Sequence, residues 1–199
     1  MPENPLFLMM ALNPEASTLT QRLQVLHDRL LDTAPAVDRI ACALYDEQED
    51  TLKTFINSTR TGEALSAYEY RLSESLSLSA LAASGEFRVL DNIEEAIKSN
   101  TAHSAWLKEQ GFRSSFTVPI YDGGSLTGFV FFDSMRAAAF TAEVQRDLVL
   151  YTTMISMATI PPTIALITTP IAIGVCPHWR SHPTKFLHVL ETMTEKIAT

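Results

Sequence analysis

Cysteines and basic residues are both scarce in this chain of 199 residues. Only two cysteines are present, Cys42 and Cys176, which is too few for a disulfide framework and favours a reducing, cytoplasmic location. The 15 lysines and arginines are outnumbered by 23 acidic residues, so the formal net charge is −8. Because an acidic surface repels phosphate groups, we expect no nucleic-acid partner.

Targeting and membrane-spanning signals are also weak. A short apolar patch over Leu6–Leu12 has no basic residue before it and follows Glu3, so we predict no secretory signal peptide. From Leu148 to Trp179 the chain has no charged residue, and this run is long enough to cross a membrane. Its prolines and threonines, and the amphipathic helix expected over its first residues, argue against a membrane span.

The charge is unevenly distributed along the chain. Residues 1–157 carry 12 basic and 21 acidic residues, a net of −9, whereas the remainder carries three basic and two acidic residues, a net of +1. We therefore expect an N-terminal extension over 1–18, a folded domain over 19–158, and an apolar, proline-broken tail with a C-terminal helix over 159–199. With 46% hydrophobic residues, the chain can form a sizeable core.

Apolar spacing predicts one amphipathic helix near each end of the domain. Leu19, Leu23, Leu26 and Leu30 are spaced four, three and four apart, which places them on one helical stripe. The same spacing recurs in a set that follows a candidate N-cap at Thr141. Its members are Val144, Leu148, Tyr151 and Ile155.

Between these helices the pattern is mainly that of antiparallel strands. A hairpin is expected around the acidic turn 46–50, and a short strand at 68–72. A short helix over 77–84 and a strand over 87–90 follow, and then a small helix that begins near Ile93. A second, longer hairpin is predicted over 115–133, with its turn at Asp122-Gly123-Gly124.

The order and motifs of these segments resemble the GAF domain family. The resemblance rests on a Val118-Pro119-Ile120 strand step, a glycine turn, the strand Gly128-Phe129-Val130-Phe131-Phe132-Asp133, and the Phe140-Thr141 start of the closing helix. It covers roughly residues 20–157. It implies an α+β fold, GAF/PAS-like, in which a central antiparallel sheet of about six strands carries the terminal helices on one face and a ligand pocket on the other.

The resemblance also implies a function and a site. Members of the family are mostly regulatory, bind cyclic nucleotides, tetrapyrroles or other small molecules, and signal through dimerised terminal helices. Aromatic and polar side chains between the sheet and the middle helices are the candidates for binding a ligand. They are Tyr70, Arg71, Phe87, Arg88, Asp91, Trp106, Ser115, Phe116 and Phe131.

The ligand itself is not identified by the sequence. The Asn-Lys…Phe…Asp-Glu set of the cyclic-nucleotide-binding members is missing, as is a Cys-His pair for bilin attachment. The same aromatic residues could instead fill the space as core, which would make the chain a structural module for dimerisation or partner docking.

Catalysis is not expected. One branch of the family reduces free methionine sulfoxide and needs several cysteines around its pocket, whereas the domain predicted here has only Cys42, in an alternating strand typical of core. No hydrolase, metalloprotease or nucleotide-phosphate motif is present. Cys176, His178 and His182 have a spacing that matches no strong metal site, so we predict no metal centre.

The two helical stripes predict a partner. Four such helices, two from each copy, could form the bundle through which these domains signal, so we expect a homodimer. In related proteins the position of the tail leads into an output domain, and we expect an output partner protein to receive the signal.

Overall fold

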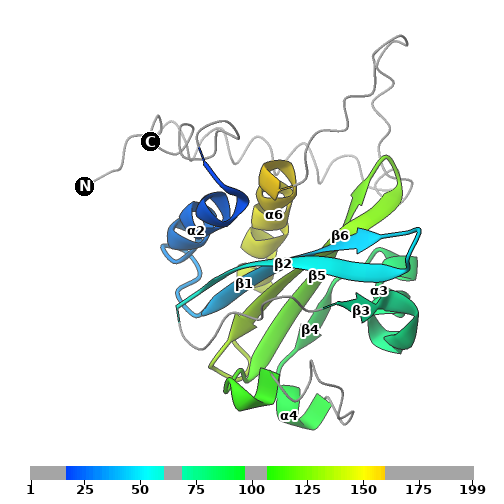
Figure 1. Ribbon diagram of the computed structural model, residues 1–199. Coiled ribbons are helices and arrows are strands. Elements are labelled where there is room, and N and C mark those ends of the chain that lie inside the picture. Colours follow the sequence, from blue (N-terminus) through cyan, green and yellow to red (C-terminus); the bar gives the residue numbers. More distant parts are fainter. Residues whose placement is uncertain (1–16, 61–68, 97–106, 160–199) are drawn as a thin grey trace, which may run out of the picture. The chain divides into compact units, whose positions relative to one another are not determined.

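Six strands form one antiparallel sheet in the computed structural model, which describes residues 17–60, 69–96 and 107–159 (Figure 1). The strand order is β3-β2-β1-β6-β5-β4. The strands are β1 (Arg39–Asp46), β2 (Thr51–Thr59), β3 (Tyr70–Arg71), β4 (Arg88–Leu90), β5 (Ser114–Asp122) and β6 (Ser125–Ser134). The predicted α+β class with a sheet of about six strands is confirmed.

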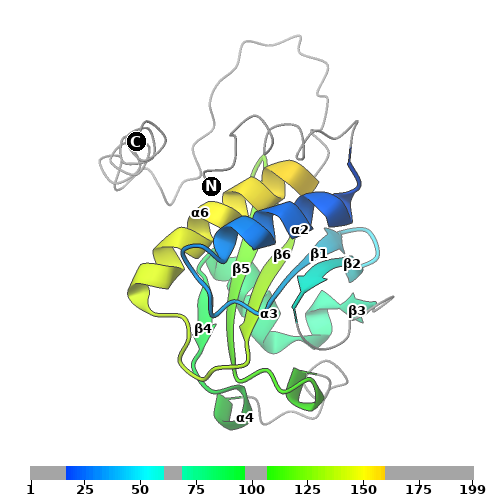
Figure 2. The same ribbon diagram turned by 90° about the vertical axis from the view of Figure 1, so that its left-hand side faces the viewer.

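Helices α2 (Leu19–Leu30) and α6 (Ala142–Thr159) lie side by side on one face of this sheet (Figure 2). Helix α2 begins with a capping box, in which the Thr18 hydroxyl accepts a hydrogen bond from the Gln21 amide and the Gln21 side chain accepts one from the Thr18 amide. The predicted apolar stripes of both helices point to the sheet, since Leu23, Leu26, Leu30, Leu148 and Ile155 are fully buried.

These stripes pack against alternate residues of the central strands. Ile40 and Cys42 of β1, Phe116 of β5 and Phe132 of β6 belong to the same buried apolar cluster as the helix residues. Because side chains alternate between the faces of a strand, the residues between them point to the other face.

Shorter elements cover that other face. The 3-10 turn Leu72–Glu74 leads into α3 (Leu76–Ser84), which ends at Gly85 in the left-handed conformation with φ of 68°. Leu72, Leu78 and Leu81 pack on Ala41 and on neighbouring apolar side chains of the sheet. A four-residue helix, α4 (Ile93–Ala96), follows β4.

The chain divides into two units, Met1–Pro162 and Thr163–Thr199, and all described residues belong to the first. The predictions for the N-terminal extension and for most of the tail, Cys176 and its neighbouring histidines included, therefore lie outside the described residues. Within the described ranges, no helix is both long enough and apolar enough to span a membrane.

Candidate functional site

Polar side chains gather on the sheet face opposite α2 and α6, beside the part covered by α3. Strand register places Arg88 opposite Thr117, and it places Ser115 opposite Asp133. Asp133 is in turn opposite Arg39 of β1. Residues directly opposite one another share a face, so these five side chains form one polar group, which we call the β4–β5 polar cluster.

The centre of this cluster is a buried ion pair. Nη1 of Arg39 lies 2.5 Å from Oδ2 of Asp133, and both side chains are only 1% exposed. Removing two charges from water is costly, and a close ion pair compensates for that cost only when both members are present. The sequence analysis did not predict this pair. Its signal in the sequence is a charged residue at the end of each of two apolar strands, Arg39 in β1 and Asp133 in β6.

Arg88 lies at the edge of the cluster and connects three elements. Its Nη1 donates a hydrogen bond to Ser77 Oγ of α3 at 2.9 Å, and its Nη2 donates to Thr117 Oγ1 of β5 at 3.3 Å. Its Nε is buried and has no hydrogen-bond partner within the described part of the chain. Burial lowers the pKa of the Arg88 guanidinium, and the nearby Asp133 carboxylate acts in the opposite direction.

The β4–β5 polar cluster is suited to bind a hydrogen-bond acceptor or an anionic group of a ligand. Since Arg39 and Asp133 neutralise each other, Arg88 gives the cluster an excess positive charge, and its Nε is a spare donor. A half-buried guanidinium with an unused N–H favours a carboxylate or phosphate oxygen. No group of three or more metal-ligating side chains occurs among the residues that the structure describes.

Ser115 and Phe131, both predicted to bind a ligand, lie on this face. Ser115 is 3% exposed and belongs to the β4–β5 polar cluster. Phe131 packs in the apolar cluster beneath α3 and contacts Phe129, with ring centroids 6.1 Å apart. The structure thus brings these two predicted residues near Arg88, with Thr117, Asp133 and Arg39 as additional members.

Phe116 and Phe87 do not join the β4–β5 polar cluster. Phe116 is opposite Phe132 and is fully buried in the cluster beneath α2 and α6. Phe87, which is 47% exposed, packs on Phe116 with ring centroids 5.1 Å apart. The reason is the two-residue alternation of strands: neighbours of Ser115 and Arg88 in sequence point to the opposite face.

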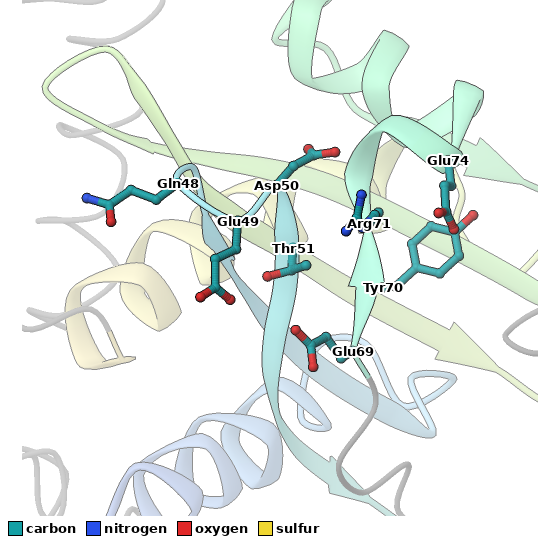
Figure 3. Close-up of a pocket in the computed structure, with 8 residues that line it drawn as sticks. All are labelled: Gln48, Glu49, Asp50, Thr51, Glu69, Tyr70, Arg71 and Glu74. Carbon is teal, nitrogen blue, oxygen red and sulfur yellow. The ribbon is translucent and has the colours of Figure 1, made fainter.

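Tyr70 and Arg71 are also separated from Arg88. They form β3, at one edge of the sheet, whereas Arg88 is in β4 at the other edge, five strand spacings or about 24 Å away along the sheet. Tyr70 and Arg71 line a separate surface hollow, which Figure 3 shows in close-up. The lining residues are Gln48, Glu49, Asp50, Thr51, Glu69, Tyr70, Arg71 and Glu74.

The side chain of Asp91 makes no hydrogen bond or ion pair with the residues that the structure describes. Asp91 is exposed after the end of β4, and its backbone carbonyl accepts a hydrogen bond from the Ala138 amide at 2.8 Å. Trp106 lies outside the described residues.

Cys42 is fully buried on the helix-covered face, where it faces Ile56 of β2 and Val130 of β6 across the strands. Its thiol therefore belongs to the apolar core beneath α2 and α6 and not to the polar face. This position agrees with the core role predicted from the sequence.

Comparison with known protein families gives one match. The sequence model of the GAF domain matches residues 18–158. No curated protein matches the chain in sequence.

Solved structures share the fold at low sequence identity. The GAF domain of an Acinetobacter phosphoenolpyruvate-protein phosphotransferase is 17% identical, with a TM-score of 0.53, over 71% of this chain and 82% of that chain. The corresponding GAF domain from Coxiella burnetii is 15% identical, with a TM-score of 0.57, over 77% and 90%. A type II free methionine-R-sulfoxide reductase from Thermoplasma acidophilum is 17% identical, with a TM-score of 0.51, over 71% and 89%.

Proposed function

Because the chain belongs to the GAF domain family of small-molecule-binding sensory domains, we propose that it is a non-catalytic sensor whose ligand binds at the β4–β5 polar cluster. In this proposal the ligand carries a carboxylate or another anionic acceptor group, and the signal leaves through α2 and α6 of a homodimer. Solved relatives include enzymes as well as sensors, and the position of Cys42 in the helix-side core favours the sensory role.

The observation that carries this proposal is the Nε of Arg88, which is buried without a hydrogen-bond partner among the described residues. A buried donor without a partner costs about 1–3 kcal/mol. A ligand oxygen that accepts this hydrogen bond would recover that cost and would neutralise the excess charge. Ligand binding would therefore stabilise the fold through a contact that the protein itself leaves unmade.

A route from this site to the helices runs through β5. Thr117 of β5 accepts a hydrogen bond from Arg88 on the ligand face, and Phe116, the residue before it, packs beneath α2 and α6 on the other face. A ligand that moves Arg88 and Thr117 would move Phe116 with them. The shift in the helices can be no larger than the difference in the affinity of the ligand for the two states.

A second candidate function is a structural module without a ligand. It is favoured by Leu72, Leu78 and Leu81, which already fill the part of the sheet face beneath α3. In that case the chain would serve dimerisation or the docking of an output partner protein, and the polar cluster would be structural.

A thermal-shift panel of small carboxylates, phosphates, nucleotides, tetrapyrroles and amino acids separates the two candidates. We expect at least one anionic compound to raise the melting temperature of the wild type, because binding to the folded state stabilises it by mass action. The increase should disappear in Arg88→Gln and persist in Arg146→Gln, which removes an exposed arginine on α6. A flat response of the wild type across the panel would favour the structural module.

A further inference from the structure

A line of hydrogen bonds joins helix α2 to strand β2. His27 of α2 is fully buried, and its Nδ1 lies 2.7 Å from Oγ of Ser58 in β2. Ser58 Oγ lies 2.8 Å from Oε1 of Gln24, and Nε2 of Gln24 lies 2.9 Å from Oδ1 of Asp28. At the other end of the line, Nε2 of His27 lies 3.1 Å from the carbonyl oxygen of Val37. We call these five residues the His27 relay.

The groups at the two ends of the relay fix the direction of each hydrogen bond in it. A carboxylate only accepts, so Gln24 presents its NH2 group to Asp28 and its carbonyl oxygen to Ser58. The Ser58 hydroxyl therefore donates to Gln24, which leaves only its lone pairs for His27. Val37 also presents an acceptor, its carbonyl oxygen. Both ring nitrogens of His27 thus face acceptors, and the complete relay needs an N–H on each of them.

A neutral imidazole carries only one N–H, so neutral His27 cannot complete the relay. A hydrogen on Nδ1 alone would leave the buried Val37 carbonyl facing a nitrogen lone pair, which is costly. A hydrogen on Nε2 keeps the bond to Val37, and the Ser58 hydroxyl then turns to donate to Nδ1. Gln24 in turn gives its NH2 group to Ser58 and releases Asp28. Because Gln24 and Asp28 are both exposed, water replaces that lost bond at little cost.

The groups around the ring decide which state is the usual one. Burial is the largest influence and lowers the pKa of His27 below its ordinary value of 6.5. The hydrogen bond to Val37 and the carboxylates of Asp28 in α2 and Asp38 before β1 act to raise this pKa, whereas Arg60 after β2 acts to lower it. His27 is therefore neutral at neutral pH and takes up a proton only in acid.

We propose that the His27 relay is a pH-sensitive switch on helix α2. While His27 is neutral, Ser58 donates to the ring and Gln24 points away from Asp28. When the ring takes up a proton, the Ser58 hydroxyl turns to Gln24, and the Gln24 amide binds Asp28. A proton bound in the core then changes the exposed side of α2, one of the two helices through which we expect the signal to leave. The switch needs no ligand at the β4–β5 polar cluster, so either proposal can fail without the other.

Nuclear magnetic resonance of the labelled full chain between pH 7.5 and 5.0 tests this proposal. At pH 7.5 the nitrogen shifts of the His27 ring should show its hydrogen on Nε2. As the pH falls, the side-chain NH2 signals of Gln24 should move with the same midpoint as the ring. Gln21 is the internal control, because its side chain accepts a hydrogen bond from the Thr18 amide on the same helix. Its NH2 signals should not follow that midpoint.

Three variants show whether the coupling runs through the relay. Ser58→Ala removes the hydroxyl between the ring and Gln24, so the Gln24 signals should stop following His27 while the ring still titrates. Asp28→Asn should lower the His27 midpoint by about 0.2–0.4 pH unit, the size expected for an exposed pair four residues apart on a helix. Asp32→Asn removes an exposed carboxylate outside the relay and should move the midpoint less.

The proposal is overturned if the Gln24 signals stay fixed while His27 titrates, or if Ser58→Ala leaves their response unchanged. It is also overturned if the neutral His27 ring carries its hydrogen on Nδ1, or if the ring stays neutral until the protein unfolds.

Discussion

At the scale of single residues, the buried pair of Arg39 and Asp133 is the feature on which the polar face depends most. The two side chains are 1% exposed and 2.5 Å apart, and β1 and β6 hold them directly opposite each other. The charge of the Asp133 carboxylate also acts on Arg88, where it opposes the lowering of the Arg88 pKa by burial. A change at Asp133 therefore affects both stability and the proposed ligand site.

We predict that Asp133→Asn lowers the free energy of unfolding by about 3–5 kcal/mol, because it leaves the Arg39 charge buried without its partner. Urea denaturation measures this change. The surface variant Asp32→Asn, at a side chain that is 74% exposed, is the control and should cost less than about 1 kcal/mol. Equal effects of the two variants would show that the Arg39–Asp133 pair has no special role.

His27 should make stability depend on pH. It is fully buried, its Nε2 donates to the Val37 carbonyl at 3.1 Å, and its Nδ1 lies 2.7 Å from Ser58 Oγ. Burial lowers the pKa of His27 in the folded protein below its ordinary value of 6.5. The unfolded chain then binds a proton more readily, so the stabilisation is complete above pH 6.5 and is lost as the pH falls below it.

Urea denaturation between pH 7.5 and 5.5 tests this prediction. The wild type should lose at most about 1.4 kcal/mol per pH unit through this group, and His27→Gln should remove that part of the slope. An unchanged slope in His27→Gln would assign the pH dependence to other groups.

At the scale of elements, local patterns predicted most of the fold. The apolar stripes of 19–30 and of 144–155, the glycine stop after α3, and both hairpins all appear in the structure. Each depends on neighbours within about four residues, which the sequence displays directly. The placement of Tyr70 and Arg88 at opposite sheet edges depends on strand order, which pairs residues far apart in the chain.

The candidate site was less predictable than the elements. The sequence predicts Ser115, Arg88, Phe116 and Phe87 for one pocket, whereas strand alternation separates them, because Phe116 packs on the helix-covered face and Phe87 packs on Phe116. Arg39 was missed because its partner Asp133 is 94 residues away in sequence. Only the register between β1 and β6 shows that the two charges meet.

The pairing of β1 with β6 leads to a prediction about Gly128. A Cβ atom at Gly128 would overlap the carbonyl oxygen of Ala43 in the neighbouring strand, so the two backbones can approach only at a glycine. Gly128→Ala should destabilise the protein by about 3 kcal/mol, measured by urea denaturation.

Gly123→Ala is the comparison, because a Cβ there meets no atom within 4 Å and only the left-handed backbone conformation opposes it. It should cost about 1 kcal/mol. If Gly128→Ala cost no more than Gly123→Ala, the close approach of β1 and β6 would not be required.

At the scale of the whole molecule, the proposed signalling requires a second copy. Helices α2 and α6 lie together on one face, and Met157 of α6 is 78% exposed. We propose that this end of α6 contacts the partner copy. A ligand bound on the opposite face would then alter the dimer through β5 and α6.

Analytical ultracentrifugation at micromolar concentration tests the dimer. The wild type should sediment as a dimer, and Met157→Asp should shift it towards the monomer, because a charge in an apolar interface is costly. Leu76→Asp places the same charge at an apolar residue of α3 that is 87% exposed, and it should leave the dimer intact. A wild type that sediments as a clean monomer would contradict dimerisation.

Nuclear magnetic resonance of the Arg88 side chain tests most directly whether a ligand binds at Arg88. The anionic compound with the largest thermal shift is titrated into labelled protein while the Arg88 Nε–Hε signal and the Thr117 amide signal are followed. We expect both signals to move together and to saturate with one dissociation constant, since the ligand takes the Arg88 Nε donor, which has no partner among the described residues. Saturable binding during which both signals stay at their free positions would contradict it.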